Sequence, residues 1–162
     1  MAKTETADLD TLRPTQLTLG FYQVHEKMDV SGQPREPAAM RKFLRDHCIR
    51  TIAGPGGALY IADHHHWARA WLELGWRTAP VRIDTDLSDL SPGAFWKKMR
   101  ALGHVHPVDE HGKYLDVDAL PATVMGMRAS GMARVIARAN PAMLCMSSST
   151  WRRKNPAQLK SP

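Results

Sequence analysis

Long hydrophobic runs are absent from the sequence, and cysteine is rare. No stretch of about 18 consecutive apolar residues occurs, and a membrane-spanning helix needs about 20. Residues 1–6 also have no apolar stretch of the kind that marks a secretory signal. The two cysteines, Cys48 and Cys145, are isolated and form no CxxC motif, which is typical of a reducing compartment. We therefore expect no membrane partner and a cytoplasmic location.

Basic residues outnumber acidic residues, and part of the excess lies near the C-terminus. The chain has 22 Lys and Arg residues against 16 Asp and Glu residues, which gives a net charge of +6. Arg152, Arg153 and Lys154 are consecutive, and such a basic segment favours contact with nucleic acid. A solvated tail would have the same composition, so both interpretations of this segment stay open.

The length of 162 residues and the hydrophobic content of 43% predict one folded domain. Residues 1–10 are expected to be a disordered lead, residues 11–140 the domain, and residues 141–162 a C-terminal extension with the basic tail. Residues 21–28 fit either a helix or an extended segment. Strands are predicted over residues 16–19, 49–53, 58–62 and 79–84, and helices from residues 37, 63, 91 and about 131.

A short apolar strand is followed by a polar turn with three consecutive histidines and then by an amphipathic helix. Asp63 precedes this helix and is expected to be its N-cap. His65, His66 and Arg69 are expected on its polar face. The amides and the dipole of a helix start attract anions, and these side chains can donate hydrogen bonds to phosphate. The pattern favours a phosphate site with His64 included, although His64 fits equally well as a packed, hydrogen-bonded residue.

The same histidines leave a metal site open as an alternative. Consecutive helical residues point about 100° apart, so His64, His65 and His66 cannot all bind one metal ion from a regular helix. Two of them could do so together with a histidine from elsewhere in the chain. A polar loop later in the sequence offers His104, His106 and His111.

The strand, turn and helix resemble a motif of the ParB/sulfiredoxin superfamily, Asp-Gly-His-(His/Thr)-Arg-x-x-Ala. The matching segment is Ile61-Ala62-Asp63-His64-His65-His66-Trp67-Ala68-Arg69-Ala70. Two flanking segments resemble a bacterial subfamily of ParB-like nucleases. These segments are Leu12-Arg13-Pro14-Thr15-Gln16 and Leu120-Pro121-Ala122-Thr123-Val124.

The resemblance implies an α+β fold, a small domain with a mixed β-sheet and packed helices. Proteins of this superfamily hold nucleotide phosphates at the strand-turn-helix motif. Some similar proteins are nucleases, some bind CTP, some phosphorylate free serine, and sulfiredoxins reduce a cysteine sulfinic acid. No cysteine lies in the motif of this chain, so the last activity is not expected.

The resemblance also implies roles for individual residues. Asp63 and His65 match the Asp and the His of the motif, and His66 matches its variable fourth position. In the serine-kinase branch a His-Glu-x-Val segment supplies a catalytic glutamate. His25-Glu26-Lys27-Met28 resembles that segment, which implies Glu26 as a base.

Two positions depart from the motif. His64 stands in place of its Gly, which limits how closely the backbone can approach a phosphate. Trp67 stands in place of its Arg, and Arg69 is the nearest residue that could compensate.

Three functions fit these residues. The first is a ParB-like nuclease or a nucleotide-dependent phosphotransferase. In it Glu26 is the base, Asp63 caps the helix or binds Mg²⁺, and the phosphate charge is stabilised by His65, His66 and Arg69. The second is a non-catalytic module that binds a nucleotide or a nucleic acid. The third is a histidine-based metal-binding protein.

Overall fold

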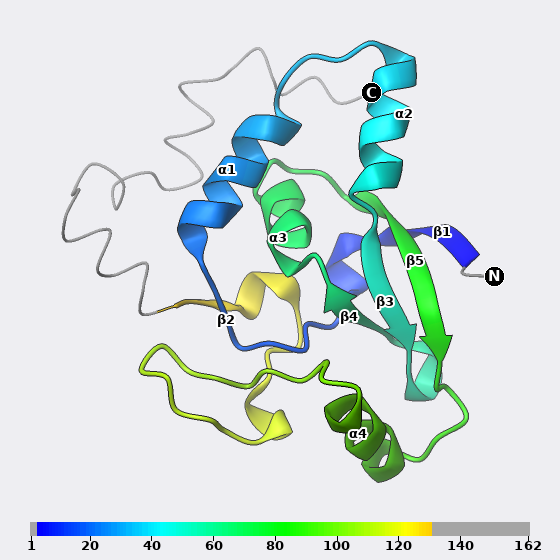
Figure 1. The fold of residues 1–162 in the computed structure, drawn as a ribbon, viewed down its shortest axis with the longest axis vertical. Helices are drawn as coiled ribbons and strands as arrows, with labels where there is room; N and C mark the ends of the chain where they lie inside the picture. Colours follow the sequence, from blue (N-terminus) through cyan, green and yellow to red (C-terminus); the bar gives the residue numbers. More distant parts are fainter. Residues whose placement is uncertain (1–2, 131–162) are drawn as a thin grey trace.

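The centre of the fold is a mixed β-sheet of four strands in the order β1-β5-β3-β4 (Figure 1). Its strands are β1 (Lys3–Asp8), β3 (Ile49–Ala53), β4 (Leu59–Asp63) and β5 (Thr78–Asp86). β1 runs antiparallel to β5 and β4 antiparallel to β3, whereas β3 and β5 are parallel. This sheet, with helices packed against it, confirms the expected α+β class.

The computed structural model describes residues 3–130 of the chain. The helix predicted near residue 131 and the extension predicted over residues 141–162 lie outside the described residues, as do Arg152, Arg153 and Lys154. None of the described helices has the length and the apolar character that a membrane crossing requires.

Helices pack at two places around the sheet. α1 and α3 lie side by side on one face, and α4 packs near the β3–β4 turn (Figure 1). A short parallel pair of strands and several 3₁₀ turns complete the described chain. The helices are α1 (Phe21–Ser31), α2 (Pro37–Asp46), α3 (His65–Glu73) and α4 (Pro92–Ala101). The strand pair is β2 (Thr18–Leu19) and β6 (Arg128–Ala129), and the turns are Leu9–Thr11, Pro55–Gly57, Val117–Ala119 and Val124–Gly126.

Local sequence signals explain several of these elements. α2 has Pro37 in its first turn, where a missing amide costs no hydrogen bond. α4 begins after Ser91, whose hydroxyl oxygen accepts a hydrogen bond from the Ala94 amide at 3.5 Å. β3 and β4, at two of the predicted strand positions, form an antiparallel hairpin. Its turn contains Gly56 and Gly57 at φ values of 71° and 77°, which only glycine adopts readily.

The N-terminal residues correct the expectation of a disordered lead over residues 1–10. Lys3 to Asp8 form β1, which pairs along its whole length with β5. The sequence gives no sign of this strand because it is polar and its pairing depends on the backbone. Pro80 lies near the start of β5, and although β5 has two neighbours, pairing with β3 begins only at Val81.

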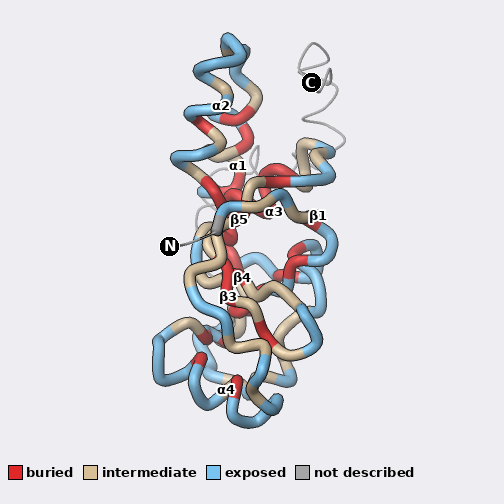
Figure 2. The backbone as a smooth tube through the Cα atoms, turned by 90° about the vertical axis from the view of Figure 1, so that its right-hand side faces the viewer, coloured by how far each residue is buried: buried red, intermediate tan, exposed pale blue. Residues whose placement is uncertain are grey.

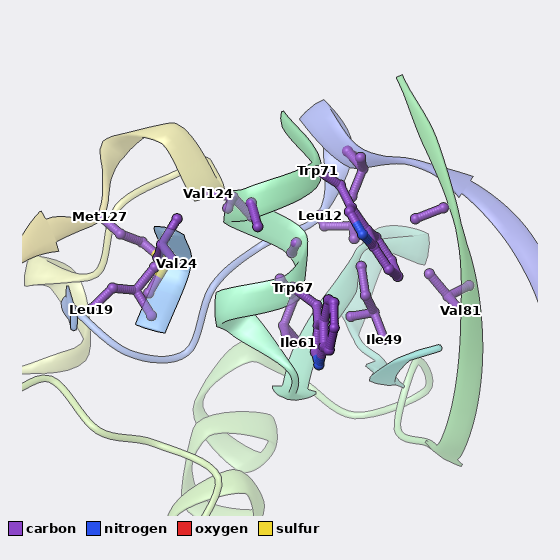
Figure 3. Packing of buried hydrophobic residues seen from close by; sticks show 14 of the residues in the cluster. Leu12, Leu19, Val24, Ile49, Ile61, Trp67, Trp71, Val81, Val124 and Met127 are labelled. Carbon is purple, nitrogen blue, oxygen red and sulfur yellow. The ribbon is translucent and has the colours of Figure 1, made fainter. Parts of the chain in front are cut away.

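The main hydrophobic core lies between α3 and the strands. In Figure 3, Trp67 and Trp71 of α3 point toward Ile49, Ile61 and Val81. A second group from α1, β2 and the chain before β6 packs against α3 from the other side. Figure 2 shows that buried residues concentrate around α3 and the central strands, whereas α2 and α4 expose most of their length. Leu102 is 42% exposed and lies just past the end of α4.

Candidate functional site

The chain turns sharply at His64, between the end of β4 and the start of α3. His64 has φ 73° and ψ 27°, and no other non-glycine residue within residues 3–130 has a positive φ. His64 is the N-cap of α3, and Asp63 is the last residue of β4. The Asp63 carboxylate accepts a hydrogen bond from the next amide, that of His64, at 2.7 Å. The expectation that Asp63 caps the helix is therefore wrong, because a capping oxygen binds amides two or three residues further on.

The imidazole of His64 connects this turn to the sheet through a hydrogen bond. Its Nδ1 lies 2.8 Å from the carbonyl oxygen of Cys48, just before β3. A left-handed residue other than glycine costs about 1–2 kcal/mol, and one hydrogen bond contributes about 1 kcal/mol. His64 thus adopts a left-handed backbone conformation that glycine would adopt without strain, and its side chain is packed and hydrogen-bonded. This geometry supports the packed interpretation of His64 over a phosphate ligand.

Substitutions at His64 are expected to separate backbone strain from side-chain anchoring. His64→Gly should leave the free energy of unfolding within about 1 kcal/mol of the parent, because relief of strain offsets the lost hydrogen bond. His64→Ala should cost about 1 kcal/mol, since it loses the bond and keeps the strain. His64→Val should cost more, because β-branched residues tolerate positive φ poorly. Urea unfolding measures this order, and a glycine variant less stable than the valine variant would contradict it.

His65 is buried and ties the start of α3 to the segment before β2. Its side chain accepts a hydrogen bond at Nε2 from the Thr15 amide, at 3.2 Å. The Thr15 hydroxyl donates instead to the carbonyl oxygen of Ile61, at 2.7 Å. Since Nε2 accepts, the proton of the neutral ring lies on Nδ1. Burial, reinforced by the neighbouring histidines His66, His106 and His64, lowers the pKa of His65 to about 3, so at neutral pH it is an uncharged positioning group.

Acid is expected to destabilise the fold through His65. Because the pKa of His65 is about 3 in the folded state and about 6.5 in an unfolded chain, the unfolded state binds the proton first. The free energy of unfolding is therefore not reduced by His65 above about pH 6.5. Below that pH it falls by up to about 1.4 kcal/mol per pH unit. Urea unfolding from pH 7.5 to 4.5 measures the slope. His65→Gln, which keeps an acceptor for the Thr15 amide, should flatten it; an unchanged slope would contradict the assignment.

His66 has a side-chain atom that the described structure leaves without a partner. Its Nε2 is buried and makes no hydrogen bond to any described residue. A Cβ placed on Gly20 would lie 3.8 Å from this atom, so Nε2 faces the N-cap of α1. Desolvation and the positive charge of Lys27 lower the pKa of His66, and Asp63 opposes them. A buried polar atom without a partner is unfavourable and marks this position as a place for a ligand.

Two helices begin beside His66. α1 starts after Gly20, which caps it without a side chain, and α3 starts at His65. Figure 1 shows the two helices running side by side in the same direction, with both starts at the lower end of the pair. Within α3 the amides of Trp67 and Ala68 bond to the His64 carbonyl, whereas the first helical amides have no intrahelical acceptor. Both helix dipoles therefore favour an anion at this place.

Arg69 lies beside the first residue of α1, with its guanidinium carbon 4.8 Å from the centre of the Phe21 ring, but its hydrogen-bond donors are engaged elsewhere. Its guanidinium forms an ion pair with Glu73 at 2.9 Å. Nη1 donates to the carbonyl oxygens of Val124, Met125 and Met127 at 3.2–3.4 Å. The Arg69 side chain is only 9% exposed. Two residues of the predicted polar face of α3, His65 and Arg69, are therefore buried, and Arg69 links the 124–127 segment to the helix.

Glu26 lies on the side of α1 that faces away from the core. It is exposed on α1, and two residues at 100° each place it about 160° around the helix from the buried Val24. Lys27, which sequence reasoning did not select, lies on the inner side, with Nζ 5.1 Å from the centre of the Trp67 ring. Thr15 and Gly20 were likewise missed. Of these residues, only Thr15 could have been found from the sequence, because it belongs to the first flanking segment that resembles the ParB-like subfamily.

The histidines do not assemble into one cluster. His64, His65 and His66 face Cys48, Thr15 and Gly20, respectively. Among residues 3–130, no group of three or more His, Cys, Asp or Glu side chains is placed to hold a metal ion. The histidine-based metal site therefore has no ligand set in the described part of the chain.

Residues 5–145 match the family model described as Putative ParB-like nuclease. The chain belongs to this family. It is also similar in structure to protein Atu1540 from Agrobacterium tumefaciens, known from a crystal structure, with a TM-score of 0.74 and 25% sequence identity. That similarity covers 88% of this chain and 69% of the Atu1540 chain. No curated protein matches the chain.

The structure shows the surroundings of the two positions at which this ParB-like domain departs from the motif. His64, at the position of the motif's Gly, has a left-handed backbone conformation, which glycine adopts most readily. The position of the motif's Arg is Trp67, which is 7% exposed and lies in the core. Lys27 is the cation that lies beside Trp67 instead.

Proposed function

We propose that this ParB-like domain binds a phosphate group of a nucleotide or a nucleic acid where α1 and α3 begin, and that it acts there as a nuclease. Transfer of a phosphoryl group from a nucleotide is the alternative chemistry for the same site. The observation that carries the proposal is the buried, unpartnered Nε2 of His66 between two helix starts. The matching family model is described as Putative ParB-like nuclease, which supports the proposed nuclease activity.

Each residue at this site has a distinct role in the proposal. His66 is kept neutral because its pKa is lowered by desolvation and by Lys27, and in the tautomer with its proton on Nε2 it donates a hydrogen bond to a phosphate oxygen. Lys27 and the helix amides add positive potential. His65 holds the start of α3 in place through Thr15. These groups favour the additional negative charge that develops on a phosphate during cleavage.

Asp63 fits the carboxylate role better than Glu26. Its side chain is 59% exposed, and its negative charge acts on His66, whose pKa it raises. Mg²⁺ is commonly held by one or two carboxylates together with substrate phosphates, so Asp63 is a suitable protein ligand. The metal would supply neutralisation of phosphate charge. Glu26 lies on the exposed side of α1 and would need a substrate that reaches around the helix.

A binding module without turnover is the second candidate, and Trp67 favours it. The motif's Arg position holds a core tryptophan, so one cation for transition-state charge is missing from the helix. Under this alternative nucleotides bind through His66 and Lys27, yet no phosphate ester is cleaved or transferred.

The test is a ligand screen followed by an activity assay. ATP, ADP, CTP, single-stranded DNA and RNA, each with and without Mg²⁺, are expected to include a ligand that raises the melting temperature by mass action. His66→Ala and Lys27→Ala should each weaken its binding by about tenfold. Lys97→Ala, an exposed lysine on α4, is the matched control and should change nothing. Equal effects of all three variants, or no ligand at all, would refute the site; binding without cleavage or transfer would establish the module.

A further inference from the structure

A pocket lies at the end of α3 opposite the proposed phosphate site. It has a volume of about 650 Å³ and is formed by α2, by the chain from Gly75 into β5, and by Thr4 and Thr6 of β1. The phosphate site is at the first residue of α3, whereas this pocket begins just after its last turn. Nine helical residues span about 13 Å, so the two sites are separate. The volume lies in the range of sites that enclose a small organic molecule.

The pocket combines an apolar wall with a cationic rim. Met40 and Leu44 from α2 and the indole of Trp76 supply the apolar surface. Trp76 is stacked on the buried Trp71, with ring centroids 5.3 Å apart and planes 16° apart. This stacking fixes the orientation of the Trp76 ring and makes the wall rigid.

Three arginines supply the rim: Arg41, Arg45 and Arg77. All three are exposed, and none of the residues that line the pocket is Asp or Glu. Asp46, the acidic neighbour of Arg45, is ion-paired with Lys42. Guanidinium groups bind carboxylate and phosphate oxygens in a bidentate manner. The rim is therefore complementary to a negatively charged head group.

We propose that this pocket binds a small amphipathic anion, with an apolar or aromatic body against Met40, Leu44 and Trp76 and an anionic head at the arginines. Apolar contact with the wall supplies affinity, and the arginines select for the charged head. The site is independent of the phosphate site at His66, and no step of the proposed phosphate chemistry uses it.

A pair of probes with the same body tests this proposal. 1-Anilinonaphthalene-8-sulfonate carries an anionic head, and N-phenyl-1-naphthylamine is the same ring system without it. On the folded protein we expect the sulfonate to bind with one-to-one stoichiometry, about tenfold more tightly than the neutral probe. The indole resonance of Trp76 should shift during the titration. Dodecanoate should displace the sulfonate, and dodecanol should do so about tenfold less effectively.

Two charge-reversed variants complete the test. Arg41→Glu combined with Arg77→Glu should weaken sulfonate binding by about tenfold or more. Lys97→Glu combined with Lys98→Glu on α4 changes the net charge equally and should leave binding within about twofold. His66→Ala should also leave it unchanged, which separates this proposal from the phosphate site. Equal binding of the two probes, equal effects of both charge reversals, or no shift at Trp76 would overturn it.

Discussion

Replacing Arg69 with alanine is expected to lower the free energy of unfolding by about 3–5 kcal/mol. The change removes the guanidinium partner of Glu73, whose side chain is only 12% exposed, and loss of one member of a buried ion pair costs about this much. It also removes the donor to three backbone carbonyls of the 124–127 segment, which are then poorly satisfied. Urea unfolding monitored by circular dichroism measures the loss.

Two further variants make the Arg69 result specific. Arg50→Ala removes an ion pair with Asp84 in which the arginine is 43% exposed, and such pairs contribute about 1 kcal/mol or less. Arg69→Met combined with Glu73→Leu should recover much of the lost stability, because apolar replacement of a whole buried pair is often neutral. If Arg69 were a phosphate ligand instead, Arg69→Ala would weaken nucleotide binding and leave the free energy of unfolding nearly unchanged.

Trp71→Ala is expected to destabilise the domain by about 3–5 kcal/mol, the usual cost of truncating a buried aromatic side chain. Trp71 is completely buried, packs against Trp67 and Trp76, and donates a hydrogen bond from Nε1 to the Ser31 hydroxyl at 2.9 Å. It thereby connects α3 to the end of α1. For a chain of this size the melting temperature should fall by about 6–20 °C.

Comparison with two other variants resolves the contributions of Trp71. Trp71→Phe keeps an aromatic ring but leaves the buried Ser31 hydroxyl without its donor, so a loss of about 1–3 kcal/mol is expected. Trp96→Ala on α4 removes a tryptophan that is only partly buried and should cost less than Trp71→Ala. A Trp71→Ala variant that melts within about 2 °C of the parent would show that α3 is not the centre of the core.

Sequence reasoning succeeded where a local signal carries the information. Ser91 and Pro92 fixed the start of α4, Pro37 that of α2, and the glycines after Ala53 the β3–β4 turn. In each case a neighbouring residue, within a few positions, determines the geometry.

Sequence reasoning failed where distant parts of the chain meet. Helical periodicity defines a polar face on α3, but it does not say that the 124–127 segment and α1 cover that face and bury Arg69 and His65. β1 was missed because its Thr-rich, Glu-containing sequence has no apolar pattern, and its place depends on the free edge of β5. The histidines acquired separate roles only through Cys48, Thr15 and Gly20, which are at least 16 positions away from their partners.

The most direct test of the central claim is the nuclear magnetic resonance signal of the His66 ring during titration with ATP and with inorganic pyrophosphate. If phosphate binds where α1 and α3 begin, the Nε2 of His66 and the backbone amides of Phe21 and His66 should shift together. The ring of His104, in the loop after α4, should stay unchanged. Shifts at His104 equal to those at His66, or a His66 ring that does not respond at saturating ligand, would contradict the account.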